Sequence, residues 1–298
     1  MGKVLVVCGC TASGKSALAV ECAKKLNAEV ISADSMQIYK GMDVGTAKPN
    51  ADEMQGISHH MIDVVDPFQP FSVSDYEKAA LPIVEGLLAE GKTPIICGGT
   101  GFYINALLYK SQFGNVGADP KVRAELERYC QERGKAALHA LLMEKDPESG
   151  KILHENDVKR VVRALEIYFT TGKKKSEQKD TPTPRFDFVC ISIAHPRERL
   201  YDRIHRRVDQ MVEQGLFAEV DRLTAAGLDI SYQSMQGIGY KEVLEGRALG
   251  KSEGEIIDAI KQNTRNYAKR QITFFKRAQN HVVFTPEDAT VENVVKEL

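Results

Sequence analysis

The chain has 298 residues, of which 43% are hydrophobic and 27% charged, a balance typical of a globular protein with a substantial core. Its net charge of −1 is uneven, since residues 1–150 carry −4 and residues 151–298 carry +3. No apolar run reaches the ~18 residues that cross a bilayer, and no signal peptide is expected ahead of the first strand. The six cysteines form no CxxC pair, which indicates free thiols and a cytoplasmic protein.

The chain begins with a predicted strand, Val4–Cys8, and a predicted helix, Ser16–Leu26. Between them the glycine-rich segment G-C-T-A-S-G-K-S fits the P-loop pattern, in which successive N–H groups surround one anion. Lys15 supplies a cation, and the Ser16 hydroxyl suits the shell of a Mg²⁺ ion. The motif therefore predicts Mg²⁺ and a diphosphate or polyphosphate group, bound by Gly9, Cys10, Thr11, Ala12, Ser13, Gly14, Lys15 and Ser16.

Two further predicted strands follow, Glu29–Ala33 and Pro94–Cys97, the second after a helix-like segment at residues 75–90. They end at Asp34 and just before Thr100. Because the carboxyl ends of parallel strands form the site in α/β proteins, both side chains are expected to share a cleft with the P-loop.

Asp34 is open to two interpretations. A carboxylate beside a phosphate loop can act as a general base, but aspartate is also a common helix cap or turn residue. The strand before Thr100 ends in glycines rather than in the acid that holds the metal of an ATPase, which counts against an ordinary NTPase or kinase.

The middle of the chain changes character. Residues 120–133 and 157–170 have helical periodicity, and residues 173–185 suggest a mobile connection. Strand-like runs then return at Asp187–Ile193 and His281–Phe284. The sequence predicts an α/β fold, a P-loop NTPase-like parallel sheet flanked by helices, with a core of residues 1–113 and 187–298 and an inserted helical domain of residues 114–186.

Two long helices are predicted after the insertion. Residues 199–215 carry Leu200, Ile204, Val208 and Met211 on one face. Residues 255–279 form a second helix with a basic face.

In this order of segments the chain resembles the tRNA dimethylallyltransferases, also called tRNA isopentenyltransferases. The resemblance runs from the P-loop to about Arg277, nearly the whole chain. It departs at Cys10, where the family usually has proline, and at Ser16, where threonine is common. Beyond the P-loop, the matching segments are SADSMQIYKGMDVGTAKP (residues 32–49), GGTGFY (98–103), KRVVRALEIY (159–168), the helix around residues 201–208, GIGYKE (237–242) and TRNYAKRQITFFKR (264–277).

The resemblance implies transfer of a dimethylallyl group from dimethylallyl diphosphate to N6 of the adenosine at position 37 of tRNA, with release of diphosphate. The P-loop would then hold the donor's diphosphate, helped by Arg203, which alone would pass for a solvated helix charge. Asp34 would accept the proton of the amine, and Thr100 would orient the reacting groups unless its hydroxyl only caps its own turn.

The resemblance also implies a tRNA interface, in which the target adenosine leaves the anticodon-loop stack. The residues expected to contact tRNA are Asp34, Ser35, Met36, Gln37, Lys159, Arg160, Val161, Val162, Arg163, Gln236, Gly237, Ile238, Gly239, Tyr240 and Lys241.

Two other functions remain as alternatives, a P-loop nucleotide or small-molecule kinase and a tRNA-binding protein that uses the P-loop as a nucleotide switch. We expect a monomer without a membrane partner. The adjacent His59 and His60 lack nearby Cys or carboxylate partners in the sequence and are expected to be ordinary polar residues rather than metal ligands.

Overall fold

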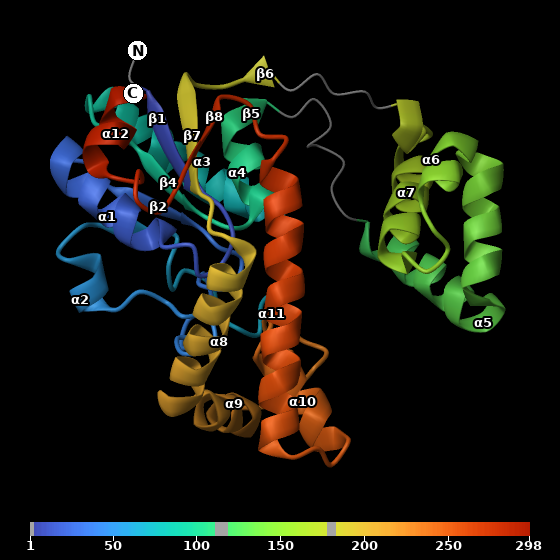
Figure 1. Ribbon diagram of the computed structural model, residues 1–298. Coiled ribbons are helices and arrows are strands. Elements are labelled where there is room, and N and C mark those ends of the chain that lie inside the picture. The colour runs from blue at the N-terminus through green and yellow to red at the C-terminus, as the bar shows by residue number, and fades with distance from the viewer. Residues whose placement is uncertain (1–2, 111–118, 178–182) are drawn as a thin grey trace. The chain divides into compact units, whose positions relative to one another are not determined.

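A computed structural model describes residues 3–110, 119–177 and 183–298 (Figure 1). The chain divides into two compact units, the first made of Met1–Tyr109 with Pro184–Leu298 and the second of Lys110–Thr183. The second unit thus interrupts the first in the sequence. The expected domain boundary after residue 113 and residues 178–182 of the expected mobile connection lie outside the described residues.

The first unit is built on a six-stranded parallel sheet ordered β3-β2-β4-β1-β7-β8. Every residue of β1, β2, β4 and β7 is buried, as expected for parallel strands covered on both faces. The predicted parallel sheet with flanking helices and a helical insertion is confirmed. Its strands are β1 (Val4–Cys8), β2 (Val30–Ala33), β3 (His59–His60), β4 (Ile95–Gly98), β7 (Phe188–Ile193) and β8 (His281–Phe284).

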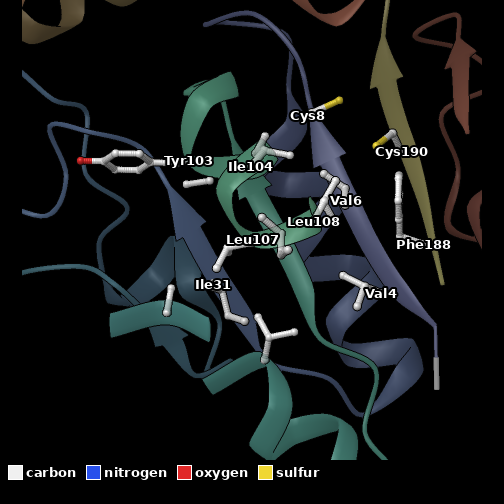
Figure 2. Close-up of a cluster of buried hydrophobic side chains, with 14 of the residues drawn as sticks. Val4, Val6, Cys8, Ile31, Tyr103, Ile104, Leu107, Leu108, Phe188 and Cys190 are labelled. Atoms are coloured by element: carbon white, nitrogen blue, oxygen red, sulfur yellow. The ribbon is translucent and has the colours of Figure 1, made fainter. Parts of the chain in front are cut away.

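Helices cover the two faces of this sheet because side chains alternate along each strand. Val4, Val6 and Cys8 of β1 pack with α3 (Val73–Ala89) and α4 (Gly101–Leu108). Figure 2 shows Ile104, Leu107 and Leu108 of α4 between Val6 of β1 and Ile31 of β2, in one buried cluster. This packing fixes the start of α4, and with it the position of Thr100.

The opposite face of the sheet carries α1 and α12. Leu5 and Val7 of β1 pack there against α1 (Lys15–Leu26) and α12 (Val291–Lys296). Since α1 follows the P-loop directly, its apolar face anchors the phosphate loop to the sheet. None of the helices within the described ranges combines the length and apolar character that crossing a bilayer requires.

Four helices of the C-terminal half complete the first unit, and Leu200, Ile204 and Val208 are buried as the periodicity predicted. The long helices α8 and α11 pack against each other, and Figure 1 shows them running side by side below the sheet. The four are α8 (Arg197–Glu213), α9 (Leu216–Ala225), α10 (Tyr240–Ala248) and α11 (Glu253–Phe275).

The second unit is helical, with a small core around Leu138, Leu142 and Leu165. Its helices are α5 (Pro120–Lys145), α6 (Pro147–Ile152) and α7 (Val158–Thr171). Glu166 is fully buried in this core. Burial raises the pKa of its carboxyl group. Hydrogen bonds from Arg123, Arg163 and the Asp119 N–H lower that pKa by more than burial raises it, so the carboxyl group has a pKa below its usual value.

The remaining short elements connect these parts. Two-residue strands form a separate two-stranded sheet, β5-β6. The short elements are α2 (Ala51–Met54), β5 (Tyr109–Lys110), β6 (Thr183–Pro184) and the 3-10 turns η1 (Lys175–Glu177) and η2 (Ser234–Gln236).

The three strands that lead to the predicted site end at one level. In the register of the sheet, Gly98 pairs with Cys8 on one side and with Ala33 on the other. A Cβ at Gly98 would lie 2.2 Å from the carbonyl oxygen of Ala33, so only glycine permits this close approach. The P-loop, Asp34 and Thr100 therefore leave the sheet as neighbours.

We expect Gly98→Ala to lower the free energy of unfolding by about 2 kcal/mol or more, because the methyl group forces backbone apart in a packed core. Urea unfolding followed by circular dichroism measures this. Gly86→Ala is the matched control, since nothing lies within 4 Å of a Cβ there and alanine favours a helix interior by about 0.5–1 kcal/mol. Equal stability of Gly98→Ala and the parent chain would contradict the close approach of Gly98 to the Ala33 carbonyl.

Candidate active site

A cavity of about 340 Å³ lies at the carboxyl ends of β1, β2 and β4, entirely within the first unit. Its wall contains many of the residues singled out from the sequence. These are Thr11, Lys15, Ser16, Asp34, Ser35, Met36, Gln37, Gln236, Gly237, Ile238 and Tyr240. The structure thus brings the phosphate loop, the carboxylate of Asp34 and the loop before α10 around one space.

The phosphate loop has the backbone of an anion cradle. Gly14 adopts φ 97° immediately before α1, a conformation that favours glycine. The Lys15 ammonium donates to the Cys10 carbonyl (3.3 Å), which curls the lysine back over the loop. Ser13 is 2% exposed, and its hydroxyl has no hydrogen-bond partner among the described residues. Loop, lysine and helix N-terminus together provide the donors that a phosphate oxygen requires.

Gln271 of α11 ties the phosphate loop to the turn before Thr100. Its Oε1 accepts from the Thr11 N–H (2.9 Å), and its Nε2 donates to the Gly99 carbonyl (2.9 Å). A Cβ at Gly99 would lie 2.1 Å from that amide nitrogen, so a glycine is needed to admit the side chain. This bridge joins two loops that are about 90 residues apart in the sequence.

Asp34 holds its own turn with one carboxylate oxygen. Oδ1 accepts from the N–H groups of Met36 (2.9 Å) and Gln37 (3.3 Å). Among the described residues, no hydrogen bond reaches Asp34 through Oδ2. The turn interpretation and the base interpretation are thus compatible, since one oxygen shapes the loop while the carboxylate still lines the cavity.

Thr100 stands next to that turn rather than in the wall of the cavity. Its Oγ1 accepts from the Ser35 N–H (3.1 Å) and lies 3.4 Å from the Ser35 hydroxyl. Although Thr100 precedes α4, its side chain makes no capping bond to that helix. Its hydroxyl therefore braces the Asp34 loop instead of its own turn.

The loop after Asp34 is fixed by a buried carboxylate that the sequence did not indicate. Glu219 of α9 accepts from the N–H groups of Asp43, Val44 and Gly45 (2.8–3.0 Å) and from the Tyr240 hydroxyl (2.6 Å). Four donors around one carboxylate compensate its burial. The wall of the cavity at Gly45 and Thr46 is held in place by this cluster.

Gln37 also helps to hold the loop that Glu219 binds. Its Nε2 lies within hydrogen-bonding distance of the carbonyls of Thr46 (3.3 Å) and Ala47 (3.1 Å), and its Oε1 accepts from the Ser32 hydroxyl (3.3 Å). The side-chain amide of Gln37, a residue expected to contact tRNA, thus already has protein partners. It would have to exchange them to contact a base.

Arg203 lies beside the phosphate loop but not in the wall of the cavity. Its Nε donates to the Ala12 carbonyl (2.6 Å), and an added Cβ at Gly14 would lie 3.7 Å from its Nη2. It therefore supports the loop from the side of α8. The next arginine on that face, Arg207, does line the cavity.

Other lining residues come from α11, the helix for which the sequence predicted a basic face. The Tyr267 hydroxyl contacts the side chains of Thr100 and Gln271, and burial raises its pKa to about 12, so it stays protonated at neutral pH. The Arg270 guanidinium lies 5.6 Å from the centre of the Tyr267 ring, a cation–π arrangement. No local pattern distinguishes these residues from the exposed face of a basic helix.

With this geometry established, comparisons with known proteins become informative. Residues 37–278 match the family model described as IPP transferase, and residues 2–67 match a model described as Isopentenyl transferase. The chain belongs to the IPP transferase family. The resemblance found in the sequence is thereby confirmed.

Individual relatives are similar over nearly the full length of this chain. A tRNA dimethylallyltransferase of Acetivibrio thermocellus is 46% identical, with 100% of this chain and 96% of the relative covered. A tRNA isopentenylpyrophosphate transferase from Bacillus halodurans, known from a crystal structure, is 41% identical in sequence. The two structures superpose with a TM-score of 0.73, over 99% of this chain and 94% of that one. A eukaryotic dimethylallyltransferase acting on tRNA has a TM-score of 0.82 at 30% identity, covering 97% of this chain and 74% of that one.

Five of the residues predicted to contact tRNA lie in the second unit, on α7. Lys159 and Arg160 are exposed, whereas Arg163 is bonded to Glu166 (2.8 Å). Val161 and Val162 are 0% and 3% exposed. Their side chains face the core of the second unit, because a helix that presents basic residues to solvent buries the residues on its opposite face.

The loop before α10 is held from within the protein. Tyr240 is fully buried and its hydroxyl donates to Glu219, while its side chain also lines the cavity. Lys241 pairs with Glu245 (3.5 Å), and Gly239 precedes α10 with φ 101°. An added Cβ at Gly237 would lie 2.5 Å from Met36, so the two loops expected to contact tRNA do meet.

Both histidines of β3 make hydrogen-bonding contacts with neighbouring protein groups. His60 contacts Glu29 (2.6 Å), and the His59 ring lies 2.9 Å from the Ile57 carbonyl. Within the described ranges, no three His, Cys, Asp or Glu side chains are grouped in a way that would hold a metal ion.

We expect Gln271→Ala to lower the free energy of unfolding by about 1–3 kcal/mol, because it leaves the Gly99 carbonyl buried without a partner. Affinity for pyrophosphate should fall as well, since the phosphate loop loses its link to α11. Urea unfolding and calorimetric titration with magnesium pyrophosphate measure the two effects. Gln262→Ala on the exposed side of the same helix is the control, and identical behaviour of both variants would contradict the bridge.

Proposed function

We propose that this protein transfers a dimethylallyl group from dimethylallyl diphosphate to N6 of the adenosine at position 37 of tRNA. The main support is that residues of the P-loop and the carboxylate of Asp34 line the same cavity, in a member of the IPP transferase family. The adenine N6 forms a bond to the allylic carbon, the bond from that carbon to the diphosphate oxygen breaks with its electron pair, and the amine proton passes to Asp34.

The donor's diphosphate would occupy the phosphate loop, against Lys15 and the Ser13 hydroxyl. Negative charge grows on the departing diphosphate, so donors fixed in advance stabilise the transition state more than the ground state. Ser16, which lines the cavity beside Lys15, would contribute its hydroxyl to Mg²⁺. When bound, Mg²⁺ supplies further charge neutralisation to the leaving group.

Asp34 is the candidate base for the incoming amine. An aromatic amine is a weak nucleophile, so a base within reach and a held leaving group both contribute. Thr100 keeps the Asp34 loop in place through Ser35, which assigns it a positioning role.

Contact with tRNA is proposed for residues on both units. Ser35, Met36, Gln37, Gln236 and Ile238 line the cavity into which a base would turn. Lys159 and Arg160 of the second unit, with Arg163, would meet backbone phosphates. The second unit would thus serve as a tRNA-contacting insertion. A monomeric state and a cytoplasmic location remain predictions.

Incubation with labelled dimethylallyl diphosphate, Mg²⁺ and unmodified tRNA tests this function. We expect label in tRNA with an equal amount of diphosphate released, loss of activity with a chelator, and no label when guanosine replaces the adenosine at position 37. Phosphate transfer from ATP to a small acceptor, without label in tRNA, would overturn the proposal in favour of a kinase.

Asp34→Asn should lower turnover about 10²–10⁴-fold, the usual contribution of a positioned general base. Binding of tRNA and of donor should change little, because asparagine retains an Oδ1 that accepts from Met36 and Gln37. Single-turnover rates and filter binding separate the two effects. Asp52→Asn on the exposed α2 is the control, and full turnover by Asp34→Asn would remove Asp34 as the base.

A further inference from the structure

His195 contacts the phosphate loop from the connection between β7 and α8, and the proposed function assigns it no role. This half-buried histidine has its Nε2 2.8 Å from the Ser13 carbonyl oxygen. Because a carbonyl only accepts hydrogen bonds, Nε2 carries a hydrogen and donates it. The described residues that line the cavity do not include His195. Its imidazole therefore acts on the cavity through the loop.

The other ring nitrogen of His195 does not compete for this orientation. Nδ1 is buried, and it has no hydrogen-bond partner among the residues that the structure describes. The next residue, Pro196, precedes α8 directly, and a residue before proline is largely confined to extended backbone. The backbone thus limits where the ring can lie, and the hydrogen bond to Ser13 is what orients it there.

The bond from His195 fixes the peptide group between Ser13 and Gly14. In a planar trans peptide the carbonyl oxygen and the N–H point in opposite directions. Since His195 holds the Ser13 carbonyl on the side away from the cavity, the Gly14 N–H is directed toward the space that an anion would occupy. Rotation of this peptide is otherwise easy, because glycine accepts both signs of φ, and it would turn the carbonyl oxygen toward the anion.

The preceding peptide of the loop is held in the same manner. Arg203 donates from Nε to the Ala12 carbonyl (2.6 Å), which directs the Ser13 N–H the opposite way. Ala12 has a φ of 60°, a left-handed conformation that costs free energy in a residue with a Cβ. Bonds to the carbonyls of Ala12 and of the residue after it stabilise this conformation. His195 and Arg203 therefore set two successive N–H groups of the phosphate loop.

We propose that His195 is a positioning residue for the donor's diphosphate, because it holds the Ser13–Gly14 peptide in the orientation that binds an anion; this inference rests on the proposed placement of the diphosphate in the phosphate loop. The Gly14 N–H then donates to a diphosphate oxygen. Negative charge grows on that group as the allylic carbon–oxygen bond breaks, so a donor oriented in advance stabilises the transition state. His195 itself touches neither the donor nor the adenine.

Calorimetric titration with magnesium pyrophosphate tests His195 without requiring turnover. We expect His195→Ala to raise the Kd for pyrophosphate about three- to tenfold, the usual effect of losing one hydrogen bond between neutral groups. His195→Gln should recover most of the affinity, because the amide nitrogen of glutamine reaches about as far from the backbone as Nε2. His195→Asn should not, because its side chain is shorter. His154→Ala is the matched control, since this histidine is exposed in the second unit, and its Kd should equal that of the parent chain.

Urea unfolding and filter binding with tRNA separate positioning from a purely structural role. We expect the affinity for tRNA to stay at the parent value in all His195 variants. An unchanged Kd for pyrophosphate in His195→Ala overturns the inference, even if its free energy of unfolding falls, and so does equal recovery by His195→Asn and His195→Gln. If His195→Ala fails to fold, the comparison of these two variants decides.

The parent chain distinguishes failure of this inference from failure of the proposed function. A parent chain that does not bind magnesium pyrophosphate overturns the inference. A parent chain that binds it with the expected dependence on His195, but does not prenylate tRNA, would refute the proposed function and support His195 as a positioning residue of an anion site.

Discussion

The common ending of three parallel strands is the constraint on which the rest of the site depends. Gly98 is paired with Cys8 and Ala33 at once, which brings the phosphate loop, the Asp34 turn and the Thr100 turn to one edge. Parallel strands have this property because their carboxyl ends must face the same way. A phosphate cradle and a carboxylate that are over twenty residues apart in the sequence thereby become walls of one cavity.

Loops that leave such an edge still need partners for their backbone groups. Buried polar side chains from the C-terminal helices provide them. Gln271 bonds the phosphate loop and the Gly99 carbonyl, and Glu219 bonds three successive N–H groups after Asp34. Each is compensated by several donors or acceptors, so each stabilises one loop conformation at little cost. The reacting groups are thus placed by helices that do not belong to the motif segments.

The sequence predicted what local patterns encode. Apolar runs located the long strands, and the glycine pattern located the phosphate loop with its helix. Gln271 and Glu219 were not predicted as braces, because their partners lie far away in the chain. The sequence did not indicate that Val161 and Val162 are buried, because the basic motif was treated as one surface although a helix divides it between solvent and core. Arg203 and Arg207 are equivalent in the sequence, and only their surroundings distinguish them.

The order of strands in the sheet has a consequence for biosynthesis. During translation β2, β3 and β4 emerge soon after β1, but the other neighbour of β1 is β7, which follows the whole second unit. The nascent chain therefore carries an apolar strand with one open edge while the ribosome makes that unit, a state prone to wrong pairing. Gln271 emerges later still. The phosphate motif is among the first segments synthesised, and its binding site is among the last to be completed.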